Sequence, residues 1–147
     1  MFFITSHPKN SKKFRTFRYK WYRIITMKVL VIDDDKLVRI MCKNILSKEG
    51  HTVIEAINGN DGLRLFKAES PDITITDMLM PDKEGLETIS DIKKINKNAK
   101  IIAMSSGGNT LNMSFLKLAQ QIGADSLLKK PFKPSELLAT MQLVIKA

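Results

Sequence analysis

Acidic, hydroxyl and amine side chains stand at the ends of short apolar segments in this sequence. Four such segments end in the acidic run 33–35, in Asp77, in the pair Ser105 and Ser106, and in Lys130. Carboxylates that are held close together repel one another, which raises their pKa values. A hard divalent cation such as Mg²⁺ relieves this repulsion, because it takes oxygen ligands and usually keeps waters or a phosphate oxygen.

The same side chains are suited to phosphoryl transfer. A carboxylate beside Mg²⁺ can attack phosphorus and form an aspartyl-phosphate. An ammonium and a hydroxyl can hold the phosphoryl oxygens by charge-assisted and neutral hydrogen bonds. Since phosphoryl transfer needs mainly positioning and charge neutralisation, these residue types favour that reaction if the fold brings them together.

The elements that must position these residues alternate between strand-like and helix-like patterns. Apolar runs predict strands at 29–32, 52–56, 73–76, 101–104 and 126–129. Helical spacing of apolar residues predicts helices at 36–49, 60–69, about 83–95, 115–122 and 137–145. Five βα repeats imply a doubly wound parallel sheet with helices on both faces. Ligands of such sheets bind beyond the carboxyl ends of the strands, where the reactive residues stand.

The composition is that of one ordinary globular domain. The chain has 147 residues, of which 44% are hydrophobic and 27% charged. No apolar run approaches the roughly 20 residues of a membrane-spanning helix, so no membrane span is expected. A single cysteine, Cys42, excludes an internal disulfide and fits a reducing, cytoplasmic setting.

The positive charge is concentrated in residues 1–26, which hold seven basic side chains and no acidic one. Subtracting seven from the net charge of +9 leaves +2 for the domain, residues 27–147. Basic residues interleaved with aromatic ones can bind nucleic acid or an anionic membrane surface. The alternatives are a disordered or loosely docked tail, or a translation start at Met27. Deletion of residues 1–26 would discriminate between these possibilities.

Four stretches of the chain resemble the response-regulator receiver domains of two-component signalling. They are residues 29–39, 72–85, 101–105 and 129–132. The four stretches occur in the order found in the family, and each lies at a predicted strand end. The resemblance covers about Lys28 to Lys146. The resemblance implies a flavodoxin-like fold, an α/β protein whose five parallel strands have the order 2-1-3-4-5.

The resemblance also implies a metal and a phosphoacceptor. Asp33 and Asp34 resemble the acidic pair that binds Mg²⁺, with Asp34 the more direct ligand. Asp77 resembles the phosphoacceptor and shares the metal, and Leu79 would offer its backbone carbonyl to the same ion.

Further positions resemble the parts of the family that respond to phosphorylation. Ser105 resembles the hydroxyl that moves to the phosphoryl group, and Lys130 resembles the characteristic lysine of the family. The bond that corresponds to Lys130–Pro131 is often cis in such domains. The family often has an aromatic residue at the position of Leu127. Leucine here departs from the usual pattern, in which the aromatic side chain moves together with the hydroxyl.

The implied function is a single-domain phosphoacceptor module whose Mg²⁺-dependent phosphorylation on Asp77 switches protein–protein contacts. Its expected partners are a sensor histidine kinase or a histidine phosphotransfer protein, and a downstream protein target. It is not expected to be an enzyme beyond phosphotransfer to itself and autodephosphorylation. No DNA-binding domain is expected in the chain.

A haloacid-dehalogenase-like phosphatase is the alternative enzyme. The run 33–35 contains the Asp-x-Asp of that family, which also uses an aspartyl nucleophile and Mg²⁺. That family usually has Thr or Val two residues after the acidic pair, where this chain has Leu37. The chain also lacks its cap domain and its later acidic pair.

Overall fold

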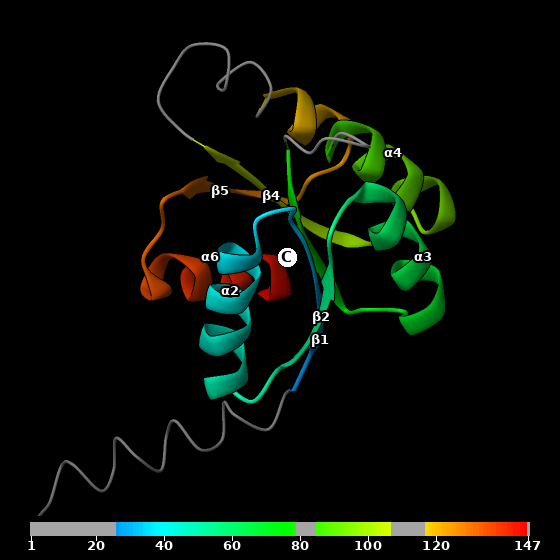
Figure 1. The fold of residues 1–147 in the computed structure, drawn as a ribbon. Coiled ribbons are helices and arrows are strands. Elements are labelled where there is room, and N and C mark those ends of the chain that lie inside the picture. Colours follow the sequence, from blue (N-terminus) through cyan, green and yellow to red (C-terminus); the bar gives the residue numbers. More distant parts are fainter. Residues whose placement is uncertain (1–25, 79–84, 107–116, 147) are drawn as a thin grey trace, which may run out of the picture.

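The computed structural model describes residues 26–78, 85–106 and 117–146 (Figure 1). In chain order the elements are β1 (Lys28–Ile32), α2 (Lys36–Lys48), β2 (Thr52–Ala56), α3 (Gly59–Glu69), β3 (Ile73–Asp77), α4 (Gly85–Ile95), β4 (Lys100–Ser106), β5 (Ser126–Lys130) and α6 (Pro134–Lys146). Residues 117–122, between β4 and β5, are also helical. The predicted alternation of strands and helices is confirmed. The proposed extension, residues 1–26, lies outside the described residues except for Thr26.

The described strands form one parallel sheet in the order β2-β1-β3-β4-β5, as the resemblance implied. The order reverses between β1 and β3, which pair side by side with Ile32 opposite Thr76. Crevices at such reversal points are where open α/β sheets bind ligands. The residues that follow β1 and those that end β3 are therefore neighbours at this edge of the sheet.

Helices cover both faces of the sheet (Figure 1). One face packs against α2 and α6, and the other packs against α3, α4 and the helical residues 117–122. Strands β1 and β3 are buried on both faces, which explains why their sequences are continuous apolar runs or carry only small polar residues. The two core layers fix the carboxyl ends of these strands, where the acidic residues stand.

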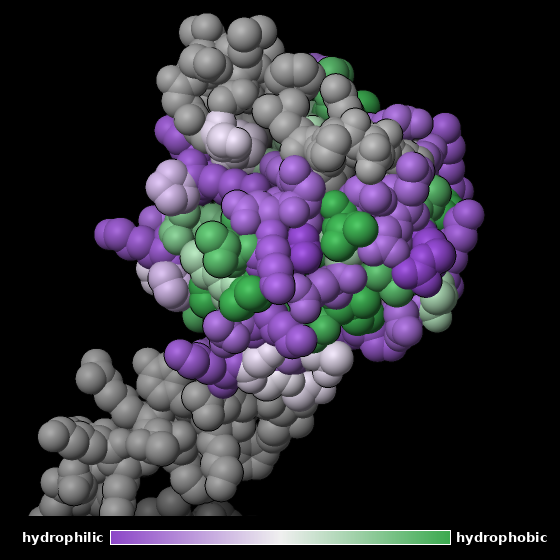
Figure 2. Space-filling model, viewed as in Figure 1, coloured by the Kyte–Doolittle hydropathy of each residue, from purple (hydrophilic) through white to green (hydrophobic). Residues whose placement is uncertain are grey.

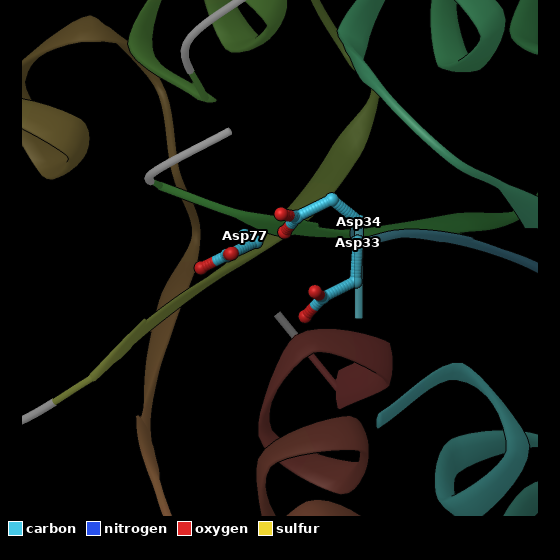
Figure 3. Close-up of side chains that lie close together, drawn as sticks. All are labelled: Asp33, Asp34 and Asp77. Carbon is cyan, nitrogen blue, oxygen red and sulfur yellow. The ribbon is translucent and has the colours of Figure 1, made fainter. Parts of the chain in front are cut away.

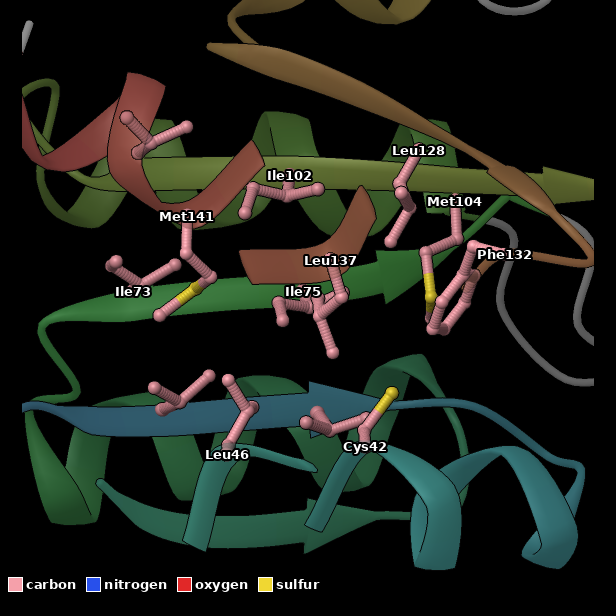
Figure 4. Packing of buried hydrophobic residues seen from close by; sticks show 13 residues of the cluster. Cys42, Leu46, Ile73, Ile75, Ile102, Met104, Leu128, Phe132, Leu137 and Met141 are labelled. Atoms are coloured by element: carbon pink, nitrogen blue, oxygen red, sulfur yellow. The ribbon is translucent and has the colours of Figure 1, made fainter. Parts of the chain in front are cut away.

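The first core layer contains the one cysteine of the chain. Figure 4 shows Cys42 and Leu46 of α2, with Leu137 and Met141 of α6, around the strands. Burial, together with the negative charge of Asp33, raises the pKa of the Cys42 thiol to about 12. The thiol is therefore a packing group and not a nucleophile at neutral pH.

The surface in Figure 2 is mostly hydrophilic, with hydrophobic side chains in separate patches. None of the helices in the described ranges is long and apolar enough to cross a bilayer.

His51 ties the start of β1 to the start of β2. The backbone N–H of Met27 donates to Nδ1 of His51 at 3.1 Å. The backbone N–H of Thr52 donates to the Met27 carbonyl at 2.9 Å. Burial lowers the pKa of His51 from its ordinary 6.5, and the charge of Glu49 opposes this shift only in part. The folded protein therefore favours the neutral ring, the form that accepts the bond from Met27.

We expect acidification to destabilise the protein through His51. The folded-state pKa lies below the unfolded-state value, so the contribution is complete above pH 6.5 and is lost as the pH falls toward the folded-state pKa. His51→Asn keeps an acceptor near the Nδ1 position but does not titrate. Urea unfolding at about pH 7.5 and about pH 5.5 should show a smaller loss of stability in the variant than in the wild type. An equal loss in both proteins would show that His51 does not cause the pH dependence.

Candidate functional site

Three carboxylates meet at the carboxyl ends of β1 and β3 (Figure 3). Asp33 and Asp34 follow the last residue of β1, and Asp77 is the last residue of β3. One carboxylate oxygen from each of the three lies within 4.8 Å of those from the other two. Asp33 and Asp77 are buried, whereas Asp34 is exposed. Three negative charges so close together need a cation to relieve their repulsion.

Lys130, at the end of β5, supplies one such positive charge. Its Nζ donates to Oδ2 of Asp33 at 2.5 Å and lies 3.4 Å from Oδ1 of Asp77. Burial lowers the pKa of Lys130, but the hydrogen bond to Asp33 and the charge of Asp77 outweigh it and raise the pKa above its ordinary 10.5. The ammonium thus stays charged at neutral pH. The bond from Lys130 to Pro131 is cis, as it often is in the domains that this chain resembles.

Backbone groups fix the turn that carries the acidic pair. Oδ1 of Asp33 accepts a hydrogen bond from the N–H of Asp35 at 2.9 Å, and the N–H of Asp33 donates to the Ala56 carbonyl at 3.1 Å. Asp35 caps α2 by accepting from the N–H of Leu37 at 2.9 Å. Both oxygens of Asp33 are therefore engaged within the protein, while Asp34 extends from the same turn toward solvent.

Asp77 is held by the residue after it and by the start of α4. The N–H of Met78 donates to Oδ1 of Asp77 and to the Met104 carbonyl, both at 2.9 Å. Gly85 begins α4 and donates its N–H to the Met78 carbonyl at 3.1 Å. A Cβ at Gly85 would overlap the Asp77 carbonyl oxygen and lie 2.7 Å from the Met78 Cα. The position therefore requires glycine. The sequence pattern did not indicate this role, although Gly85 ends one of the stretches that resemble receiver domains.

We expect Gly85→Ala to lower the free energy of unfolding by about 3 kcal/mol, because the added Cβ meets backbone that cannot move aside. Gly62→Ala, in α3, is the matched control. Its Cβ would meet the side chain of Ile32, with Cγ1 at 2.8 Å, and a side chain can adjust more easily. Chemical denaturation of both variants should show the larger loss for Gly85→Ala. The reverse order of stability would contradict this account of Gly85.

Among the remaining predicted positions, the structure describes Ser105 and Leu127. Ser105 lies in β4, one residue after Met104, the register partner of Asp77. It is 3% exposed, and its Oγ has no hydrogen-bond partner in the described part of the chain. Leu127 is partly buried in β5 against the second core layer. Leu79 lies outside the described residues.

The donor set of the acidic cluster fits Mg²⁺. The ion takes oxygen ligands and is usually held by one or two carboxylates plus waters or phosphate oxygens. Asp34 and Asp77 offer carboxylate oxygens from the ends of two strands, and Asp33 supports the turn that carries Asp34. The exposure of Asp34 leaves space for water or a phosphate oxygen to complete the coordination.

Comparison with known proteins decides the family. The sequence model of the response regulator receiver domain matches residues 29–142. The chain belongs to the response regulator receiver family. This receiver domain is 37% identical over 120 residues to the chemotaxis protein CheY of Thermotoga maritima, covering 81% of this chain and 98% of that protein. It is 30% identical over 110 residues to the sporulation initiation phosphotransferase F of Bacillus subtilis, covering 75% and 86%.

Solved structures agree with this assignment. The chemotaxis protein CheY4 of Vibrio cholerae superposes on the receiver domain with a TM-score of 0.74 at 28% identity, over 82% of this chain and 99% of that chain. The receiver domain is thus similar in both fold and sequence to signalling modules of two-component systems.

Proposed function

We propose that this receiver domain is the phosphoacceptor of a two-component phosphorelay and is phosphorylated on Asp77 in a Mg²⁺-dependent reaction. The observation that supports this most directly is the convergence of Asp77 with Asp33 and Asp34, their oxygens within 4.8 Å of one another. The ammonium of Lys130, 3.4 Å from Oδ1 of Asp77, adds the positive charge that a phosphoryl group needs.

Each side chain has a role in the proposed reaction. Asp34 and Asp77, with Asp33 in support and the backbone carbonyl of Leu79, would hold Mg²⁺, which when bound neutralises negative charge on the carboxylates and the phosphoryl oxygens. An oxygen of Asp77 attacks phosphorus, a new O–P bond forms, and the bond from phosphorus to the donor breaks with the electron pair leaving on the donor.

Two further residues would respond to the transferred phosphoryl group. Lys130 exchanges part of its contact with the carboxylates for a charge-assisted hydrogen bond to a phosphoryl oxygen. Ser105 has a buried Oγ without a hydrogen-bond partner in the described residues, so a phosphoryl oxygen would satisfy it. Movement of Ser105 toward the phosphoryl group would couple phosphorylation to the outer surface of β4 and β5. Leu127, in place of an aromatic residue, leaves this coupling without a ring that turns inward.

The proposed donor is a sensor histidine kinase or a histidine phosphotransfer protein, and the proposed output is contact with a downstream protein. Similarity to a sporulation phosphotransferase and to chemotaxis proteins supports a role in passing or reading a phosphoryl group. We propose a cytoplasmic setting, which the buried unpaired cysteine fits.

The proposal is tested by titrating Mg²⁺ during labelling with acetyl phosphate. The wild type should gain the mass of one phosphoryl group only when Mg²⁺ is present. Asp34→Ala should require much more Mg²⁺, by more than roughly tenfold, because residues that only support metal ligands already cost 10- to 100-fold in affinity. Asp35→Asn removes the same charge from the next position, keeps a capping side chain, and serves as the control. Labelling of the wild type that is independent of Mg²⁺ would contradict the proposal.

A further inference from the structure

A guanidinium lies behind the acidic pair. Arg39, one turn into α2, donates from Nη1 to the carbonyl oxygen of Asp33 at 2.8 Å and to that of Asp34 at 3.3 Å. Its side chain is 12% exposed. The guanidinium thus bonds the backbone of both residues of the pair at the point where the chain leaves β1.

A carboxylate from β2 pairs with Arg39 in this position. The Nε of Arg39 forms an ion pair with Oε1 of Glu55 at 3.5 Å, without a hydrogen bond between the two atoms. The other oxygen of Glu55 lies 3.5 Å from Nζ of Lys43, whose side chain is 53% exposed. Arg39 therefore links β2 to the turn after β1. Lys43 contacts Glu55 only at the protein surface. The planar fork of arginine suits several acceptors at fixed angles, which the single ammonium of lysine does not match.

The positive charge of Arg39 is electrostatically unfavourable for metal binding by the acidic pair. A positive charge so near the pair repels a divalent metal ion and should weaken its binding. The favourable feature is geometric, because Arg39 bonds the backbone carbonyls of the pair and not their carboxylates. It adds to the hydrogen bonds that Asp33 and Asp35 make in the same turn, and it contacts the backbone of Asp34, whose side chain is exposed.

We propose that Arg39 is a positioning residue for the metal site. Its guanidinium fixes the backbone of Asp33 and Asp34 so that their carboxylates keep the spacing that Mg²⁺ needs, and Glu55 keeps the guanidinium in place. This inference rests on the proposed function, since it takes the acidic cluster to be a Mg²⁺ site.

The possible roles of Arg39 predict different changes in the Mg²⁺ affinity of the Arg39→Gln variant. If only its charge mattered, Arg39→Gln would bind Mg²⁺ more tightly, because repulsion is removed. If Arg39 only stabilised α2, the variant would melt earlier but bind Mg²⁺ normally while folded. If it positions the pair, Mg²⁺ affinity falls although a repelling charge has gone.

The experiment is a calorimetric titration of Mg²⁺ into the full chain, well below the melting temperature of each variant. Arg39→Gln should lose roughly tenfold in affinity, within the range for residues that support metal ligands. Lys43→Gln removes one positive charge from the same helix without touching the turn, and should bind as tightly as the wild type or slightly more tightly. Arg39→Lys keeps the charge but not the fork, so its affinity should also fall.

Glu55→Gln provides a test that leaves Arg39 in the chain. It should weaken Mg²⁺ binding less than Arg39→Gln, and it keeps the inference testable if that variant fails to fold. A wild type that binds Mg²⁺, with Arg39→Gln or Glu55→Gln binding equally or more tightly, would overturn the positioning role alone. A wild type that binds no Mg²⁺ would overturn the proposed function and this inference with it.

Discussion

Asp77→Asn is expected to abolish phosphoryl labelling by acetyl phosphate while leaving the protein folded. The amide oxygen of Asn can still accept the hydrogen bond that the N–H of Met78 donates at 2.9 Å. The amide lacks the anionic oxygen that attacks phosphorus, so no acyl phosphate forms. Mass spectrometry of the intact chain should show no phosphoryl gain under conditions that label the wild type fully.

Asp72→Asn is the matched control for this variant. Asp72 precedes the amino end of β3, opposite to Asp77, and its Oδ2 accepts from the N–H of Lys28 at 2.7 Å. Asp72→Asn removes a carboxylate beside the same strand without touching the acidic cluster, and its amide oxygen can still accept the bond from Lys28, so labelling should continue. Wild-type labelling of Asp77→Asn would show that another residue accepts the phosphoryl group.

Lys130→Met should lower both the rate of labelling and the stability of the protein without Mg²⁺. Asp33 is 0% exposed and would lose the ammonium that lies 2.5 Å from its Oδ2. Removing one partner of a buried ion pair costs about 3–5 kcal/mol. The labelling rate should fall by roughly 100- to 1,000-fold, the usual cost of removing one donor that stabilises developing negative charge.

Lys129→Met separates this effect from a general loss of positive charge. Lys129 precedes Lys130 in β5, and its side chain is exposed. Successive side chains of a strand point to opposite faces, so Lys129 points away from the face that Lys130 occupies. Initial labelling rates and urea unfolding should therefore be near wild type in this control. Equal rates and equal stability for the two variants would show that the contacts of Lys130 have no role in the reaction.

The sheet was predictable because the strands have simple signatures. β1 and β3 are buried on both faces, so the acidic residues are preceded by an apolar run in β1 and by alternating isoleucine and threonine in β3. The carboxyl end of β4 could not be predicted from an apolar run. It continues to Ser106, beyond the apolar run 101–104, because backbone pairing of Ser105 and Ser106 with β5 does not depend on side-chain polarity.

Supporting residues of the site were not predictable from the pattern. Arg39 looked like any polar residue on a helix, and its hydrogen bonds to two carbonyls exist only once the turn after β1 has formed. The need for glycine at 85 depends on how closely α4 approaches the Asp77 carbonyl, which no periodicity reveals. Sequence patterns locate groups at strand ends, whereas contacts between different elements decide what holds those groups in place.

The most direct test of phosphorylation on Asp77 is to locate the transferred phosphoryl group in the chain. An acyl phosphate formed with acetyl phosphate and Mg²⁺ can be reduced by borohydride, which converts the phosphorylated aspartate to homoserine with release of phosphate. Peptide sequencing by mass spectrometry should then find homoserine at position 77 and unmodified aspartate at 33, 34 and 35. Homoserine at 33, 34 or 35 would contradict the account and would favour a phosphatase-like nucleophile after the first strand.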